Sequence, residues 1–176
     1  MSDRVLETKR LKLRALAKTD AADIARGIGD WDVIQWLTSP PYPYALEDAH
    51  SYLARDHDGP LAIELGGNFV GVVGLHDPAD DRLAELGYWL ARPYWGQGIM
   101  TEAASAVVAA HFNRSDMSVV SGYLLGNGRS NAVLAKLGFV DTEIIQQFSH
   151  PWGKERPCQR MELSAKTWQA NANAPG

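Results

Sequence analysis

The spacing of apolar residues along the chain switches between two periods. Apolar and basic residues alternate in residues 11–16 (LKLRAL), which is the pattern of a half-buried strand. In residues 100–112 (MTEAASAVVAAHF), Ala104, Val107 and Phe112 instead recur at helical spacing and give one apolar face. The same two patterns predict further strands over residues 61–65, 69–75, 83–91, 118–125, 139–148 and 158–164, and further helices over residues 18–28, 31–37, 46–56 and 129–137.

The order of these elements predicts an α/β (α+β) fold, in which helices flank a single mixed sheet that is mostly antiparallel. Two apolar runs on either side of residues 66–68 (GGN) favour a β-hairpin, and the later strands alternate with helices. No internal repeat or linker interrupts this order. We therefore expect residues 1–176 to form one domain, with a core over about residues 8–168 and a flexible tail over residues 169–176.

Composition and charge narrow the range of partners. Apolar residues make up 45% and charged residues 22% of the 176-residue chain, a mix that is typical of globular proteins. The formal net charge is −4 and no Lys/Arg cluster occurs, so we expect no nucleic-acid partner. Cys158 is the only cysteine, which excludes an internal disulfide and a thiolate zinc site, and we expect no metal. No apolar run approaches the roughly 18 residues that span a bilayer, so we expect a cytoplasmic protein without a membrane partner.

The segment YWGQGIMTEA (residues 94–103) places two glycines between a predicted strand and a predicted helix. The first N–H groups of a helix have no intrahelical partner, and glycine lets a phosphate approach them closely. A P-loop is excluded because no Gly-Lys-Ser/Thr follows, and a dinucleotide-binding turn is disfavoured because Thr101 occupies the place of its third glycine. The turn alone leaves two interpretations open, a phosphate site and a plain bend between strand and helix.

A second segment, GNGRSNAVLAKLGF (residues 126–139), favours the phosphate site. Together with YWLARPYWGQGIMTEA (residues 88–103), it resembles the GNAT superfamily of acetyl-CoA-dependent N-acetyltransferases, and in particular the branch that acetylates ribosomal-protein N-termini. The resemblance covers about residues 8–165 and implies a GNAT-like sheet that is splayed at an acetyl-CoA site. It assigns the following residues to acetyl-CoA binding: Trp89, Leu90, Ala91, Trp95, Gly96, Gln97, Gly98, Ile99, Met100, Thr101, Asn127 and Ser130.

Two positions depart from the family pattern. Met100 stands where the family prefers Gly or Ala beside the phosphates, and Leu134 stands where many members carry a tyrosine that protonates the departing thiolate. In the resembled branch the serine of Asn-x-x-Ser takes this role, which implies Ser130 as the catalytic acid. Asn127 would then contact the pantetheine arm or the thiol. The alternative for both residues is that they cap the following helix, which we expect to begin near Asn131.

Acetylation of an amine needs a donor for the oxyanion and a base for the proton. The resemblance implies that the backbone N–H of Leu90 is the donor. Glu85 is the first candidate base, acting through water, because it lies roughly 16 Å along the strand from Leu90. The alternative is that Glu85 is a solvated or salt-bridged strand residue. His150 is the second candidate, because the loop between the last strands borders the acceptor site in this fold, and His76 is the third.

Four aromatic residues belong to the early helices and the Pro-rich loop after them, a region that covers the acceptor in the resembled family: Trp31, Trp36, Tyr42 and Tyr44. Such residues would form an aromatic wall for a peptide N-terminus or another amine. The alternative is that Trp36 lies in the core and the tyrosines pack on the prolines.

The resemblance implies transfer of an acetyl group from acetyl-CoA to a primary amine, either a protein N-terminus or a small-molecule amine. The reaction would be a direct attack in a ternary complex, because Cys158 is distant in sequence from both motifs and does not favour a covalent acyl-enzyme. The alternative function is a CoA-binding regulatory or interaction module that has lost catalysis. A homodimer is compatible with both, as the commonest oligomeric state.

Overall fold

A computed structural model describes residues 5–55, 59–76 and 83–172 of the chain. Within these residues, eight strands form one sheet in the order β1-β2-β3-β4-β5-β6-β8-β7. Neighbouring strands are antiparallel except for the parallel pair β5–β6, so the expected mixed, mostly antiparallel sheet is confirmed. The strands are β1 (Leu6–Glu7), β2 (Leu11–Ala15), β3 (Leu61–Leu65), β4 (Asn68–His76), β5 (Ala84–Leu90), β6 (Val119–Leu124), β7 (Val140–Ser149) and β8 (Lys154–Leu163).

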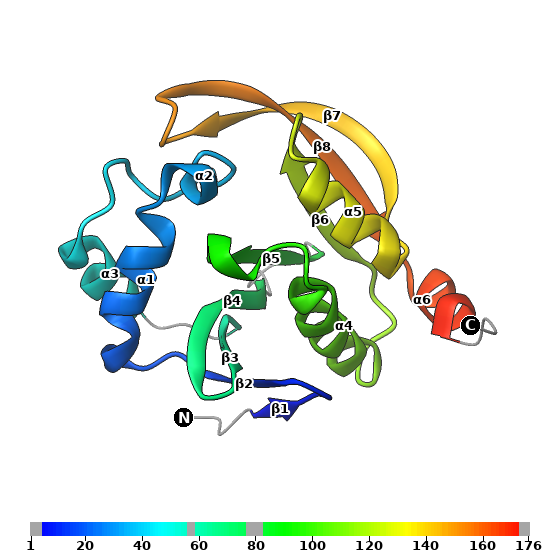
Figure 1. Ribbon diagram of the computed structural model, residues 1–176. Helices are drawn as coiled ribbons and strands as arrows, with labels where there is room; N and C mark the ends of the chain where they lie inside the picture. The colour runs from blue at the N-terminus through cyan, green and yellow to red at the C-terminus, as the bar shows by residue number, and fades with distance from the viewer. Residues whose placement is uncertain (1–4, 56–58, 77–82, 173–176) are drawn as a thin grey trace.

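The helices lie on the two faces of this sheet. Figure 1 shows α1, α2 and α3 gathered on one side of the molecule and α4 and α5 on the other. Over the described residues, no helix combines the length and the apolar composition needed to cross a bilayer. The described helices are α1 (Ala21–Ile28), α2 (Trp31–Ile34), α3 (Leu46–Leu53), α4 (Ile99–Phe112), α5 (Gly128–Leu137) and α6 (Ala165–Ala172), with short 3₁₀ turns η1 (Lys18–Asp20) and η2 (Arg92–Tyr94).

Two hydrophobic clusters correspond to these two faces. The larger cluster packs α4 and α5 against the sheet and includes Leu13, Val73, Leu86, Val108 and Leu134. The smaller cluster packs α1 and α3 against the opposite face and includes Ile24, Ile34 and Ala49, with Phe69 and Trp89 packed against it. Because side chains alternate along a strand, β5 directs Leu86 and Tyr88 to the first cluster and Trp89 to the second.

Some element boundaries differ from those that the sequence predicts. The strand expected from residue 158 already begins at Lys154, because it pairs with the whole length of β7 in a long hairpin. Helix α6 reaches Ala172 and therefore enters the segment for which we expected a flexible tail. The ring of Trp168 stacks on that of Phe112, with centroids 6.1 Å apart, and this contact attaches α6 to α4. Residues 173–176 lie outside the described residues.

The parallel strands β5 and β6 separate shortly after they meet. They pair only at Ala84 with Val119 and at Glu85 with Val120, whereas β5 remains paired with β4 up to Leu90. At the point of separation the hydroxyl of Ser121, which is 1% exposed, donates to the carbonyl of Leu86 at 2.8 Å. The Ser121 hydroxyl thus gives the Leu86 carbonyl a hydrogen-bond donor in place of a backbone N–H of β6. The sheet is therefore splayed at its centre.

Candidate functional site

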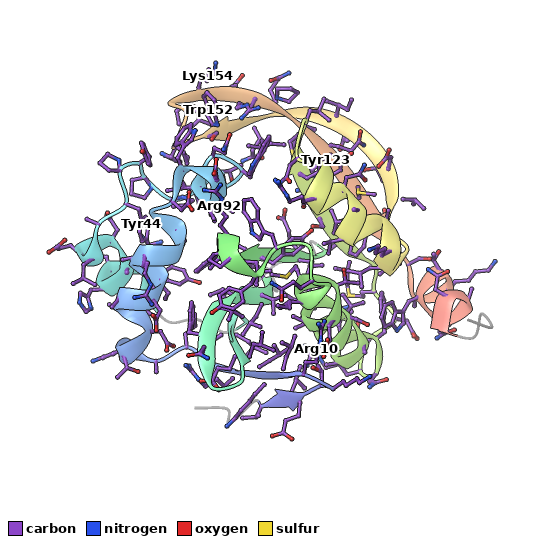
Figure 2. All side chains as sticks on the ribbon, in the orientation of Figure 1. Arg10, Tyr44, Arg92, Tyr123, Trp152 and Lys154 are labelled. Atoms are coloured by element: carbon purple, nitrogen blue, oxygen red, sulfur yellow. The ribbon has the colours of Figure 1, made fainter. Side chains whose placement is uncertain are left out.

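A cleft of about 830 Å³ opens where β5 and β6 diverge. Its walls come from both halves of the sheet and from the N-terminal parts of α4 and α5. Figure 2 shows Tyr123 on the β6 side of this opening, whereas Arg92 follows the end of β5 on the other side. The expected site residues that line the cleft are Trp36, Glu85, Trp89, Leu90, Trp95, Gly96, Gly98, Ile99, Met100, Thr101, Asn127 and Ser130.

The turn before α4 has the geometry of an anion site. Gly96 and Gly98 both have φ of 73°, a left-handed conformation that glycine adopts without strain. Gly98 is the N-cap of α4 and the first backbone bond of the helix runs from Glu102 N–H to its carbonyl at 3.1 Å. The N–H groups of residues 99–101 therefore have no intrahelical partner and lie at the positive end of a 14-residue helix. A Cβ added at Gly96 would meet no atom within 4 Å, so an anion can approach the turn.

Arg10 of the β1–β2 connection braces this turn from outside the cleft. Its guanidinium donates to the carbonyl of Gln97 at 2.9 Å and to the carboxylate of Glu102 at 2.7 Å, and Thr8 donates to the same carboxylate at 2.6 Å. Burial opposes ionisation of Glu102, but the hydrogen bonds from Thr8 and Arg10 outweigh it and lower the pKa of this carboxyl. Gln97 does not line the cleft, and neither does Ala91.

Met100 does not obstruct the turn. Its side chain is 5% exposed and packs in the larger hydrophobic cluster, so its bulk is accommodated inside the protein. On the other side of the turn, the indole of Trp95 donates to the carbonyl of Leu90 at 2.7 Å, and the guanidinium of Arg129 lies 4.4 Å above the Trp95 ring. The positive charge of Arg129, a residue of α5, thus lies next to the turn that contains the glycines.

The backbone of β5 turns the N–H of Leu90 toward the cleft. Ala91 N–H donates to the carbonyl of Val70 at 2.9 Å, and Leu90 faces Gly71 in the register with β4. Because hydrogen-bonded and non-hydrogen-bonded pairs alternate in an antiparallel ladder, the N–H of Leu90 points away from β4. On that side β6 has already diverged. The N–H therefore faces the space where an oxyanion would need a donor.

A contact between Tyr88 of β5 and Ser130 of α5 joins the two walls of the cleft. Their hydroxyl oxygens are 2.8 Å apart, and Tyr88 Oη also lies 3.3 Å from the Ser130 carbonyl. Burial raises the pKa of Tyr88 to about 12, although the hydrogen bond with Ser130 lowers it in part. The Tyr88 phenol is therefore neutral at physiological pH. No signal in the sequence indicates this contact between Tyr88 and Ser130.

Of the two residues expected to cap α5, Asn127 does so and Ser130 does not. Helix α5 begins at Gly128, earlier than the expected start near Asn131, and the side chain of Asn127 accepts from Ser130 N–H at 3.2 Å as its N-cap. Ser130 lies in the first turn, and its hydroxyl contacts Tyr88 and caps nothing. Leu134, one turn later, is fully buried in the core.

The candidate bases lie in different places. Glu85 lines the cleft, and its carboxylate forms an ion pair with Arg160 at 2.6 Å, so it is salt-bridged and at the same time in a position to serve the cleft. His76 also lines the cleft and faces Glu85 across the β4–β5 register. His150 is not among the lining residues: its ring packs on Phe148, although its backbone N–H donates to the carbonyl of Thr38, which does line the cleft. The loop of His150 therefore borders the cleft through Thr38, while the His150 side chain is not part of its lining.

Cys158 lies in the wall of the cleft, although its position in the sequence had suggested that it was remote. The strand β8 pairs with β6 and carries it there. Burial raises the pKa of this thiol, which keeps it protonated and a poor nucleophile. No group of three or more His, Cys, Asp or Glu side chains that could hold a metal occurs among the described residues.

The four aromatic residues expected at the acceptor site do not form one continuous wall of the cleft. Trp36 lines the cleft, but Trp31 packs against Tyr42 and Trp152, with ring centroids 4.8 and 5.0 Å apart. Tyr44 packs against the smaller hydrophobic cluster. In Figure 2, Tyr44 lies beside α1, whereas Trp152 lies at the end of the β7–β8 hairpin above α2. Sequence reasoning missed Trp152 because only the folded hairpin brings it to α2.

Known proteins share both the sequence pattern and the fold. Residues 10–140 match the family model described as "Acetyltransferase (GNAT) domain". The chain is 32% identical over 145 residues to the "Putative ribosomal N-acetyltransferase YdaF" of Bacillus subtilis (strain 168), and the match covers 76% of this chain and 79% of that protein.

Two solved structures illustrate the similarity of fold. Mycobacterium smegmatis RimJ in complex with CoA-disulfide superposes with a TM-score of 0.75 at 25% identity, over 89% of this chain and 82% of that chain. An acetyltransferase of the GNAT family from Bacillus anthracis superposes with a TM-score of 0.82 at 17% identity, over 93% of this chain and 99% of that chain. The fold of the chain is thus a known one.

Proposed function

Because the chain belongs to the GNAT acetyltransferase family, we propose that it transfers the acetyl group of acetyl-CoA to a primary amine by direct attack in a ternary complex. The observation that carries this proposal is the convergence of three groups on one cleft: the N–H groups of the first turn of α4, the Leu90 N–H and the Ser130 hydroxyl. A protein N-terminus is the first acceptor to test, since the relative YdaF is named for ribosomal N-acetylation. A small-molecule amine is the second.

The residues of the turn fit the pyrophosphate of acetyl-CoA. The positive φ values of Gly96 and Gly98 expose consecutive N–H groups, and the helix dipole favours an anion there. Arg129 beside Trp95 adds a positive charge at the edge of the same turn. On this basis residues 96–101 would hold the phosphates, and Asn127 and Ser130 would border the pantetheine end.

Acetyl-CoA supplies the acetyl group as a thioester. In the proposed step the N–H of Leu90 donates to the thioester oxygen as negative charge develops on it, while the amine nitrogen bonds to the carbonyl carbon and the carbon–sulfur bond breaks. Ser130 gives its proton to the departing sulfur and is reprotonated by the proton that the nitrogen of the tetrahedral adduct must lose to become the amide. Tyr88 is a positioning residue: when its phenol donates to Ser130 Oγ, the serine hydrogen is free to point at the sulfur.

The attacking amine must lose a proton, because amines with a pKa of about 10 are mostly protonated at neutral pH. We assign this proton to Glu85 through water, since its carboxylate lines the cleft opposite His76. The ion pair with Arg160 holds the carboxylate in place. The same ion pair, together with the buried Leu134, is what favours the second candidate function, a CoA-binding module without catalysis.

Thiol release from acetyl-CoA separates the two functions. The panel of acceptors contains peptides that begin with Ser, Ala or Thr, polyamines and aminoglycosides. An enzyme releases thiol in proportion to an acceptor, whereas a binding module releases none above background. Ser130→Ala should lower kcat with little effect on CoA binding, and Ser51→Ala, at an exposed position of α3, is the matched control.

A further inference from the structure

Arg156 lies between two tryptophans; of these three residues only Trp36 lines the cleft. Its guanidinium carbon is 4.7 Å from the ring of Trp152 and 5.7 Å from the ring of Trp36. Trp36 lines the cleft, and the Trp152 indole donates to the carbonyl of Gln35 at 2.9 Å. The guanidinium is therefore held by one ring from the cleft wall and one ring from the β7–β8 hairpin.

The register of the sheet places Arg156 on the cleft side of β8. Cys158 and Arg160, which follow at two-residue intervals, both line the cleft. Gln147, which also lines the cleft, faces Arg156 directly across the β7–β8 ladder. Residues that face each other in an antiparallel pair share one side of the sheet. Arg156 therefore extends the row of cleft residues toward the side of the hairpin and Trp36.

The charge of Arg156 has no anionic partner among the residues that the structure describes. Its Nη1 atom is buried and makes no hydrogen bond. Two other arginines near the cleft are neutralised, Arg160 by Glu85 at 2.6 Å and Arg92 by Asp32 at 2.8 Å. The faces of two indoles attract a cation, but they leave its N–H groups unsatisfied. A buried guanidinium nitrogen without a hydrogen-bond acceptor is unfavourable until an anion binds it.

We propose that Arg156 binds a carboxylate of the acceptor, so that the preferred acceptors are amines that also carry an acidic group. The planar guanidinium is suited to a carboxylate, which it can engage with two parallel hydrogen bonds. This inference rests on the proposed function, because it concerns the acceptor of the same cleft. It reverses the simple expectation from a net charge of −4, which would favour a purely cationic amine.

The acidic group can come from a peptide or from a free amino acid, and matched acceptors distinguish the two sources. One arm compares peptides with N-terminal serine that carry Glu or Gln at the second, third or fourth position. The other arm compares free glutamate with free glutamine. Because Glu and Gln differ in charge and hardly in shape, their ratio of kcat/KM isolates the carboxylate. Thiol release measures turnover, and quenching of tryptophan fluorescence in the presence of CoA measures acceptor binding.

In the wild type, we expect one Glu acceptor to exceed its Gln counterpart in kcat/KM by roughly tenfold, mainly through a lower KM, as a charge-assisted hydrogen bond allows. Arg156→Met should abolish this preference and Arg156→Lys should retain part of it. Lys154→Met is the matched control, because it removes one positive charge that lies 5.4 Å from the same Trp152 ring, and it should keep the preference.

Equal turnover of Glu and Gln acceptors at every position would overturn the inference while the proposed function stands. A loss of preference in Lys154→Met equal to that in Arg156→Met would also overturn it, because the effect would then be one of general charge. If no acceptor is turned over, the proposed function fails, and the fluorescence arm still decides whether Arg156 selects acidic ligands. The comparison in the wild type needs no variant and so does not depend on the folding of Arg156→Met.

Discussion

Removing the Tyr88 hydroxyl tests whether it positions Ser130 for proton transfer. Tyr88→Phe deletes the oxygen that lies 2.8 Å from Ser130 Oγ and keeps the ring that packs against the core. A neutral hydrogen bond contributes about 0.5–1.5 kcal/mol net. Since about 1.4 kcal/mol corresponds to tenfold in rate, kcat should fall roughly two- to twelvefold. The affinity for CoA should change little, because the turn before α4 is not touched.

A double-mutant cycle with Ser130→Ala makes this test specific. Loss of the acid itself should lower kcat by about 10²–10⁴-fold. Without the Ser130 hydroxyl, Tyr88 has nothing left to position, so Tyr88→Phe should then have almost no further effect on kcat. Steady-state thiol release gives kcat for the four proteins, and calorimetry gives their CoA affinity.

Tyr123→Phe makes the same chemical change elsewhere in the cleft and is the matched control. We expect it to leave the contact between Tyr88 and Ser130 intact. Full activity of Tyr88→Phe would refute a positioning role. Additive effects of the two substitutions would refute it as well, because independent residues do not share a catalytic function.

Three further predictions concern stability and the turn. Ser121→Ala should lower the free energy of unfolding by about 1–3 kcal/mol in urea titrations, because the buried Leu86 carbonyl loses its donor. Gly98→Ala should cost about 1–2 kcal/mol and weaken CoA binding, because φ of 73° strains an alanine, whereas Gly128→Ala at the start of α5 should not. Burial raises the pKa of Glu102, but its hydrogen bonds lower it more, so that the pKa in the folded protein is below the ordinary 4.5. The ionised Glu102 carboxylate therefore stabilises the folded protein above pH 4.5, and this stabilisation is lost as the pH falls through the folded pKa. The stability difference between wild type and Glu102→Gln should therefore shrink in acid unfolding experiments, and a constant difference would contradict this.

The sequence predicts most strands and the central turn because both depend on local patterns. Alternation in residues 11–16 and the two glycines before residue 99 can be read without knowledge of the fold. Helix α6 was not predicted, because it depends on the contact of Trp168 with Phe112, which lies far away in the sequence. The same holds for β8, whose first residues become a strand by pairing with β7.

The site residues also fall into two groups, those that a local motif identifies and those that only the fold brings to the cleft. Gly96 and Gly98 could be found from their motif, but the partner of Ser130 could not, because Tyr88 lies 42 residues earlier on another element. The sequence separation of Cys158 from the motifs was misleading, since β8 pairs with β6 and brings it to the cleft. For His150 the expected position of the loop holds, because its backbone is bonded to the cleft residue Thr38, but its ring packs on Phe148 and does not line the cleft.

The most direct test of acetyl transfer in the gap between β5 and β6 is a crystal structure with CoA and an acceptor analogue. We predict phosphate oxygens within hydrogen-bonding distance of the N–H groups of residues 99–101, the CoA sulfur beside Ser130 Oγ and the acceptor nitrogen on the Trp36 side of the cleft. CoA bound away from the turn, or a sulfur atom remote from both Leu90 and Ser130, would contradict the assignment of this cleft as the site of transfer.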